Sequence, residues 1–361
     1  MTNPKEFTIG KVTVPMGQAL DIQLEVSERY TGEPVSLPIR VIRGMHPGPC
    51  VFVTAGIHGD ELNGVGIVHE LAFGRPLVLT RGTLIMVLVV NIFGFETQQR
   101  TMPDRRDLNR CFPGSLDGSL SGRIAHIIFK EVVTKSDYGI DLHSAAAPRI
   151  NFPNIRGDLS VPSIKRLSGV FGCELIVNSK GPMGSLRREA TKHGCPTIIL
   201  EAGQPCKIEP AVLKIGIRGV RNVLKELAMM PGRPLGPAHT SRVEKSMWVR
   251  AETGGILRYH VSPGKSVKAN QPIATTVSVF GKEQSVLKSP VDGVVLGMTT
   301  LPTVKPGEPV CHIAIPDKPH KASGHGRRDR LHYRARKDLA TSIAISEREG
   351  GWSNGAEGED G

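Results

Sequence analysis

Two potential metal ligands, His58 and Glu61, lie three positions apart in the segment GIHGDELNG (56–64). The segment follows CVFVTA (50–55), an apolar run typical of a buried β-strand. A turn after such a strand could direct both side chains towards one ion. The alternative is an ordinary solvated turn, because a glutamate at the start of a helix is also stabilised by the helix dipole.

A third potential ligand, His143, ends another apolar run, YGIDLHS (138–144), at the equivalent strand-end position. Two histidines and one carboxylate are a common ligand set of hydrolytic zinc sites, since they leave one coordination position open. Asp141 lies two residues earlier, on the same face of the predicted strand, where it could orient the imidazole. A partly buried histidine at a strand end is the alternative. Matched ligand types at two strand ends favour one zinc ion per chain, bound by His58, Glu61 and His143.

A further carboxylate, Glu201, follows the apolar residues of TIILEAG (197–203). Burying a carboxylate without a partner is costly, so a purely structural position for Glu201 is disfavoured. As a general base that takes a proton from the attacking water it would have a chemical role. We therefore interpret Glu201 as the catalytic base of a hydrolase.

A basic segment, QRTMPDRRDLNRCFPG (99–114), separates two of the apolar runs and contains the adjacent residues Asn109 and Arg110. Arginine binds carboxylates through two parallel hydrogen bonds and keeps its charge at all ordinary pH values. A solvated basic loop is the alternative. Its position next to the predicted site indicates that it recognises an anionic substrate.

The elements that must position these residues follow an alternating pattern from residue 50 onwards. Apolar runs lie at 50–55, 84–91, 138–144, 173–178 and 197–203, and segments of helix length lie at 60–72, 121–134, 161–171 and 209–229. The pattern predicts an α/β fold with a mixed, largely parallel sheet flanked by helices. In such sheets functional residues collect beyond the carboxyl ends of the strands, where His58, His143 and Glu201 are expected.

Three further segments complete the predicted organisation. Residues 7–45 resemble short strands, so we assign 1–235 to the α/β domain, and the Pro- and Gly-rich stretch 229–242 resembles a linker. Residues 243–315 contain short strand-like runs and a degenerate repeat, 254–276 against 292–314, which predicts a small all-β sandwich domain that caps the cleft.

The net charge of +12 is concentrated near the C-terminus, where residues 318–337 contain eight Lys or Arg and one Asp. We expect 317–361 to be a mostly disordered basic tail, with a weak polyanion contact as the alternative. No run approaches the roughly 18 apolar residues of a membrane span, and the N-terminus lacks a secretory pattern. Six scattered cysteines without a CxxC pair favour reduced thiols in the cytoplasm.

Four ordered motifs, GIHGDE, RDLNRCFPG, DLHS and ILEAG, make the chain resemble the succinylglutamate desuccinylase/aspartoacylase family over about residues 45–315. That family has a zinc carboxypeptidase-like fold. The resemblance implies that zinc binds to His58, Glu61 and His143, and that Glu201 acts as the general base and acid.

The resemblance also assigns roles in substrate binding. It implies that Asn109 and Arg110 bind the substrate carboxylate and that Arg100 polarises the carbonyl of the scissile amide. Arg187, in GSLRREA, matches a further substrate-binding arginine. The alanine-rich stretch after His143, SAAAPRINFPNIR, departs from aspartoacylase, so the roles of Arg149 and Tyr259 stay open.

The leading interpretation is a zinc amidohydrolase that acts on a small N-acyl amino acid. A metallocarboxypeptidase acting on short peptides is an alternative, although a β-domain over the cleft would exclude longer peptides. A biotinyl- or lipoyl-like carrier, with Lys282 in VFGKEQS as the modified residue, is a second alternative. A nucleic-acid binder would rest on the basic tail alone, so we expect no specific nucleic-acid partner and no membrane partner. The acyl group, the amino acid and a possible homo-oligomer stay open.

Overall fold

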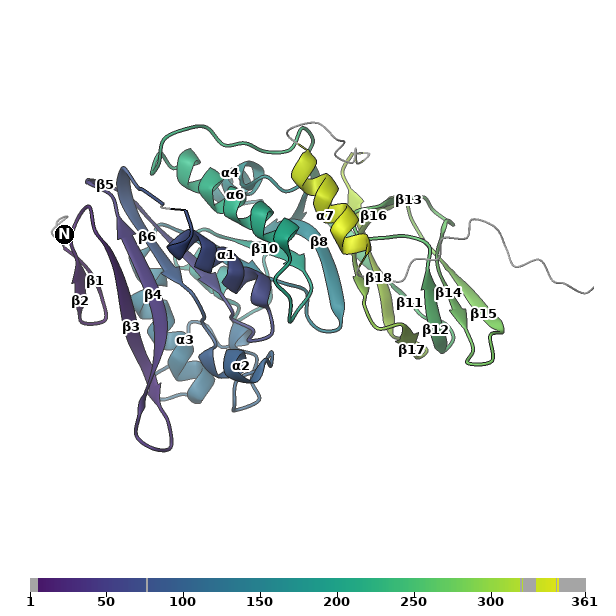
Figure 1. Ribbon diagram of the computed structural model, residues 1–361, viewed down its shortest axis with the longest axis horizontal. Coiled ribbons are helices and arrows are strands. Elements are labelled where there is room, and N and C mark those ends of the chain that lie inside the picture. Colours follow the sequence, from purple (N-terminus) through teal and green to yellow (C-terminus); the bar gives the residue numbers. More distant parts are fainter. Residues whose placement is uncertain (1–5, 76, 319, 321–328, 342, 344–361) are drawn as a thin grey trace, which may run out of the picture.

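The computed structural model describes residues 6–75, 77–318, 320, 329–341 and 343. A mixed twelve-stranded sheet runs through both halves of the chain in the order β13-β16-β18-β11-β9-β8-β10-β7-β5-β6-β4-β3 (Figure 1). The strands of its α/β part are β3 (Ala19–Glu28), β4 (Pro34–Arg43), β5 (His46–Ala55), β6 (Arg81–Val87), β7 (Tyr138–His143), β8 (Arg149–Gly157), β9 (Leu175–Asn178) and β10 (Thr197–Gly203). A separate two-stranded sheet pairs β1 (Phe7–Ile9) with β2 (Val12–Val14).

Helices cover both faces of this α/β part. The helices are α1 (Leu62–Phe73), α2 (Ile92–Thr97), α3 (Leu120–Glu131), α4 (Pro162–Phe171), α5 (Leu186–Lys192) and α6 (Pro210–Glu226), with short 3₁₀ turns at Leu108–Arg110 and Val133–Lys135. Helices α1, α4 and α6 share one buried apolar core, whereas α3 and α5 share a second one. The predicted mixed sheet flanked by helices is therefore present.

Neighbouring parallel strands bring the predicted functional residues together. Strands β5, β7 and β10 are adjacent and parallel, so their carboxyl ends meet at one edge of the sheet. His143 lies directly opposite Glu201 in the ladder between β7 and β10. Thr54, near the end of β5, lies opposite Asp141.

The prediction lacked strand β8, which lies between β9 and β10. A proline inside a central strand is unusual because it cannot donate a ladder hydrogen bond, and Pro153 lies in the middle of β8. The ladder with β10 changes register between Asn151 and Asn154, and this bulge accommodates the proline. Helices α2 and α5 were also missing from the prediction, because both are short.

Every regular element described between residues 241 and 316 is a strand. These strands are β11 (Ser241–Arg250), β12 (Gly255–Tyr259), β13 (Ser266–Val267), β14 (Pro272–Val277), β15 (Glu283–Lys288), β16 (Gly293–Thr299), β17 (Thr303–Val304) and β18 (Pro309–Pro316). A four-stranded sheet, β15-β14-β12-β17, shares a buried core with the β13-β16-β18-β11 end of the large sheet. Because β11 pairs with β9 and β16 pairs with β8, the large sheet continues between the two regions. The division into domains at 235 and 243 stays a prediction.

The C-terminal segment differs from the expected disordered tail where the structure describes it. Helix α7 (Arg330–Ala340) packs against α6 and β8 (Figure 1). His332, Ala335 and Leu339 are fully or almost fully buried, because three positions of one helical face point inwards despite the many basic residues. Residues 321–328 and 344–361 of the predicted tail lie outside the described residues.

Among the described residues, no helix combines the length and apolar character that a membrane span requires. All six cysteines are free thiols, and four of them are buried.

Candidate metal centre and active site

A tight turn after β5 delivers His58 and Glu61 to the edge of the sheet. Gly56 adopts φ +64°, which favours glycine, and a Cβ on Gly59 would lie 1.9 Å from the carbonyl carbon of Gly94. Helix α1 starts directly after Glu61. The glycines of this motif are therefore needed to bring the backbone close enough to aim both side chains at one point.

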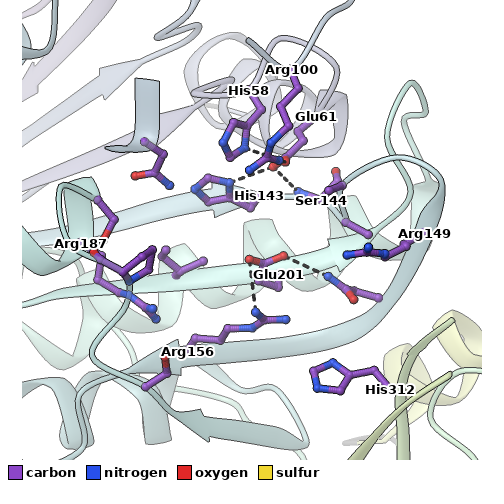
Figure 2. Close-up of a pocket in the computed structure, with 18 of the residues that line it drawn as sticks. His58, Glu61, Arg100, His143, Ser144, Arg149, Arg156, Arg187, Glu201 and His312 are labelled. Carbon is purple, nitrogen blue, oxygen red and sulfur yellow. Dashed lines mark hydrogen bonds and ion pairs between the residues drawn. The ribbon is translucent and has the colours of Figure 1, made fainter. Parts of the chain in front are cut away.

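His58, Glu61 and His143 converge at this point, and all three are at most 4% exposed. One ligand atom from each lies within 4.8 Å of the others. His58 Nδ1 is 2.7 Å from Glu61 Oε1, and His143 Nδ1 is 2.8 Å from Glu61 Oε2. The three predicted metal ligands are thus brought together by elements that are far apart in the sequence (Figure 2).

The outward-facing nitrogens of both imidazoles contact carboxylates. His58 Nε2 lies 3.0 Å from Asp107, and His143 Nε2 lies 2.7 Å from Asp141, which also accepts a hydrogen bond from Thr54. Since an ionised carboxylate only accepts, each Nε2 carries a proton, and loss of the proton on Nδ1 would leave a lone pair that faces the centre. The buried His58 Nδ1 makes no hydrogen bond. This donor set fits a divalent cation such as zinc.

The charges at this centre are strongly coupled. Burial lowers the pKa of His143, but the carboxylates of Asp141 and Glu61 outweigh it and raise the pKa well above its usual value. Burial raises the pKa of Glu61, but His58 and His143 outweigh it and hold the pKa far below its usual value. A bound divalent cation would attract the Glu61 carboxylate in place of the two protonated imidazoles, and both imidazoles would release a proton.

Arg100 lies on the rim of the centre. Its guanidinium donates one hydrogen bond of 3.0 Å to Glu61 Oε1 and another of 3.1 Å to Asp107 Oδ2. Asp107 therefore joins His58 to Arg100. Asp107 lies inside the RDLNR motif. An acidic residue between arginines could have marked this position in the sequence, but the sequence analysis gave Asp107 no role.

Glu201 points into the same cavity and stays outside the group of three ligands. Its Oε2 accepts a hydrogen bond of 3.0 Å from Asn151, and its Oε1 lies 3.8 Å from Arg156 Nη1. Both partners come from β8, the strand that the prediction lacked. The carboxylate is thus held from one side, near the metal centre.

The predicted substrate-binding residues line one side of the cavity. The side-chain oxygen of Asn109 accepts a hydrogen bond of 2.9 Å from the backbone of Leu186, at the start of α5. The next residue, Arg187, is 4% exposed, and its Nε and Nη1 have no hydrogen-bond partner. Burial lowers the pKa of Arg187 to about 10, so it remains a cation at neutral pH. Arg110 lines the same side with a half-exposed side chain.

The cavity has a volume of about 380 Å³, and its lining includes Arg149, whose role the sequence analysis left open, and four residues that it did not single out. Arg149, Asn151 and Arg156 of β8 line it, together with Trp248 of β11 and His312 of β18. No motif marked these five positions, because tertiary pairing alone brings β8, β11 and β18 to the site. Tyr259 is buried and donates to the carbonyl of Thr299, and it does not belong to the described lining.

Comparison with known proteins supports a common origin for this arrangement. Residues 47–227, about half of the chain, match the family described as the succinylglutamate desuccinylase/aspartoacylase catalytic domain. The N-alpha-acetyl-L-2,4-diaminobutyric acid deacetylase of Halomonas elongata is 27% identical over 298 residues, which cover 78% of this chain and 86% of that protein.

Solved structures share the fold. A succinylglutamate desuccinylase/aspartoacylase from Rhodobacter sphaeroides is 26% identical, with a TM-score of 0.73 that covers 83% of this chain and 95% of that one. The product-bound ectoine utilization protein EutE (DoeB) from Ruegeria pomeroyi is 22% identical, with a TM-score of 0.74 and coverage of 84% and 97%. The family match spans most of the strands and loops that build the cavity, and the chain therefore belongs to the succinylglutamate desuccinylase/aspartoacylase family, whose named relatives are deacylating hydrolases.

Proposed function

We propose that this chain is a zinc-dependent amidohydrolase that removes the acyl group from a small N-acyl amino acid. The observation that carries the proposal is the convergence of His58, Glu61 and His143 beside Glu201, in a cavity whose far side presents Arg187. A metal-ligand set, a carboxylate base and an anion-binding cation are the three parts that such a hydrolysis needs.

The metal would be held by His58 Nδ1, His143 Nδ1 and the carboxylate of Glu61. When bound, it would polarise the amide carbonyl and lower the pKa of a water molecule. Asp107 and Asp141 hold the proton on Nε2 of their imidazole partners, which keeps both Nδ1 atoms available as ligands.

Glu201 would take a proton from the attacking water and return it to the leaving amine. Its hydrogen bond from Asn151 fixes one carboxylate oxygen and leaves the other near Arg156. Such proton transfers typically contribute about 10²–10⁴-fold to the rate. Arg100, on the metal side, would polarise the scissile carbonyl.

The substrate carboxylate would bind to Asn109, Arg110 and Arg187. The oxygen of Asn109 is occupied by the backbone of Leu186, so its side chain can offer only the NH₂ group, which suits an anionic acceptor. The unpartnered nitrogens of the buried Arg187 would gain the hydrogen bonds that they lack.

A carboxypeptidase acting on short peptides and a carrier with a modified Lys282 are less well supported. The β-rich region contributes Trp248 and His312 to a cavity of about 380 Å³, a size that suits a small substrate better than a peptide. The family match over 47–227 supports the hydrolase against a carrier.

A substrate screen tests the proposal. Zinc-loaded protein is incubated with acetyl, formyl and succinyl derivatives of common amino acids and with dipeptides, and the released amine is measured. We expect turnover of at least one N-acyl amino acid and none of the dipeptides. Turnover of dipeptides alone would support the carboxypeptidase, and no turnover in a fully metal-loaded sample would contradict the amidohydrolase.

A further inference from the structure

A strongly basic surface lies outside the cavity, on helices α6 and α7, which pack side by side (Figure 1). It contains two adjoining pockets of about 560 and 530 Å³, and Lys214 and Leu331 line both of them. No residue of either lining belongs to the cavity beside Glu201. The basic surface is defined by the cations of the two linings, which are Arg75, Lys214, Arg218, Arg221, Lys225, Arg330, Arg334 and Lys337.

Helical spacing arranges most of these cations in two stripes. The four basic residues of α6 follow one another at intervals of four, three and four positions, so they lie on one face of the helix. Arg330, Arg334 and Lys337 repeat this spacing on α7, and all three are exposed. Within the α6 stripe, Arg218 points partly inwards, where its guanidinium donates to the carbonyl of Gly172. The two stripes border the same pair of pockets.

The basic surface has few acidic neighbours. Glu70 and Asp338 are the carboxylates of the two linings, against eight cations. Among the described residues, none of the eight cations forms an ion pair, and the nearby Glu226 pairs with Arg166. Like charges at this density repel one another, so an anionic partner would relieve a repulsion that the free protein carries.

The arrangement of the charges fits a chain of phosphates. Residues three or four positions apart are separated by about 4.5 to 6 Å along a helix, so the α6 stripe extends over about 16 Å. A nucleic-acid strand carries roughly one phosphate per 3.4 Å of its axis, and a stripe of this length therefore spans several phosphates. Basic residues clustered along a helix in a chain of net charge +12 are the electrostatic signature of such binding.

Two other anionic partners fit the surface less well. A membrane-binding helix presents bulky apolar side chains to the lipid, and of the large aliphatic side chains in the two linings only Leu235 is exposed. The centre of a protein–protein interface is apolar and depleted of charge, whereas interfaces with nucleic acids are polar and positively charged. The composition of the basic surface is of the second kind.

We propose that the basic surface binds the phosphate backbone of a nucleic acid without regard to its sequence. This goes beyond the proposed function, because the surface and the cavity share no residue. It is compatible with the expectation of no specific nucleic-acid partner, since contacts with phosphates carry no sequence information. The sequence analysis considered a polyanion contact for the tail alone, and α6 supplies four of the eight cations.

The first test measures binding of the full chain to a short, fluorescently labelled DNA duplex of random sequence by anisotropy. We expect binding at low salt, and an affinity that falls roughly 10²-fold between about 50 and 200 mM salt, as for about four phosphate contacts. Phosphatidylserine vesicles and polyglutamate are titrated in parallel. Absence of DNA binding at the lower salt concentration would overturn the proposal, and binding of vesicles or polyglutamate in its place would identify a different partner.

The second test locates the binding. The triple variant Lys214→Gln/Arg221→Gln/Lys225→Gln removes the outward-facing charges of the α6 stripe. Its affinity for the duplex at low salt should be at least about tenfold lower than that of the parent. The salt dependence should also become shallower, because each lost phosphate contact lowers the slope by about one. Parent affinity in this variant would overturn the assignment to α6.

A matched control removes the same charge elsewhere. Lys282, Lys288 and Lys305 are exposed in the strand-rich region and line neither pocket. Their triple substitution by glutamine should leave the affinity within a factor of about two of the parent, because salt screens distant charges. Melting temperature and zinc content show that both triple variants are folded with an intact metal centre. An equal loss of affinity in both would mean that net charge alone drives binding, and would overturn the proposal.

Discussion

The two walls of the cavity are built in different ways. The metal wall is held by hydrogen bonds and ion pairs among charged groups: His58 and His143 contact Glu61, and each has its own aspartate. The second wall, formed by Arg149, Trp248 and His312, is held by stacking, with Arg149 on Trp248 and Trp248 on His312. His58, Glu61, His143 and Asp141 of the metal wall are almost completely buried, whereas Arg149, Trp248 and His312 are partly exposed.

On the proposed function, this difference separates the residues for catalysis from those for selectivity. Charged groups locked in a dry network can keep ligand atoms within a few tenths of an ångström of their working positions. A stacked wall tolerates changes in shape and charge better than a network of ion pairs, and on the proposed function it would contact only the part of the substrate that does not react. We therefore expect substitutions in the metal wall to change turnover, and substitutions in the second wall to change substrate preference.

The largest effect should come from removing a metal ligand. His143→Ala should lose bound zinc and reduce kcat to below about a thousandth of the parent value, because metal and water activation are lost together. Metal analysis beside kcat measures both, and His69→Ala on the exposed face of α1 is the matched control. Full zinc occupancy in His143→Ala would show that the metal wall is assigned incorrectly.

The next largest effect separates the two carboxylates. Glu201→Gln should keep zinc and substrate affinity and lose at least about 10²-fold in kcat, because the amide cannot accept the proton. Glu61→Gln should instead lose metal affinity, since its carboxylate contacts both histidines. Zinc content and kcat of both variants decide the point. If Glu201→Gln stays within a few-fold of the parent, Glu201 is not the base.

An intermediate effect is expected from the second wall. Trp248→Ala should raise KM about tenfold for the preferred substrate and change kcat only a few-fold, because the stack binds a group remote from the scissile bond. Trp248→Phe retains an aromatic face and should restore part of the affinity. Steady-state kinetics of both variants test this, and a kcat decrease as large as that of Glu201→Gln would contradict the separation of the walls.

The smallest effect on activity is expected behind the second wall, where α7 packs against β8. Burial lowers the pKa of His332 to about 4; Glu174 opposes this shift, while Arg218 and Arg336 add to it. An unfolded histidine titrates near 6.5, so the unfolded chain binds more protons between about pH 6.5 and 4. The free energy of unfolding should therefore fall as the pH decreases through this window, with a contribution from His332 of at most about 3 kcal/mol.

His332→Gln isolates that contribution. The free energy of unfolding of the variant should depend less on pH between about 6.5 and 4 than that of the parent, with kcat at pH 7 nearly unchanged. Denaturant unfolding at several pH values gives the free energy of unfolding of both chains. Their difference isolates His332, because His312 titrates in the same window in both chains. Identical pH dependence in both chains would show that α7 does not bury His332 in solution.

Much of the α/β part could be predicted from the sequence because its signals are local. Buried parallel strands appear as continuous apolar runs, so β5, β7 and β10 were located with small errors at their ends. Residues at the ends of adjacent parallel strands must meet, and this explains why His58, His143 and Glu201 could be grouped before their distances were known. The roles given to Arg100, Asn109, Arg110 and Arg187 stay predictions, although all four line the cavity.

Other features depend on contacts that no local pattern encodes. Pro153 made β8 hard to recognise as a strand in the sequence. The bulge that accommodates this proline exists only in the pairing of β8 with β10. Helix α7 was not recognised in its basic segment. The helix is stabilised by burial of three residues against α6 and β8, and not by the helix propensity of the segment.

The sequence alone was enough to predict that His58, Glu61 and His143 come together. Residue types and strand ends are local properties, and adjacent parallel strands bring their carboxyl ends to one edge of the sheet. Only the tertiary structure decided the composition of the second wall. Arg149 and His312 are more than 160 positions apart in the sequence. Pairing of β8 with β16, and of β11 with both β9 and β18, brings them to the same cavity. Long-range strand pairing depends on the packing of whole sheets, so residues that depend on it carry no signal in their own neighbourhood.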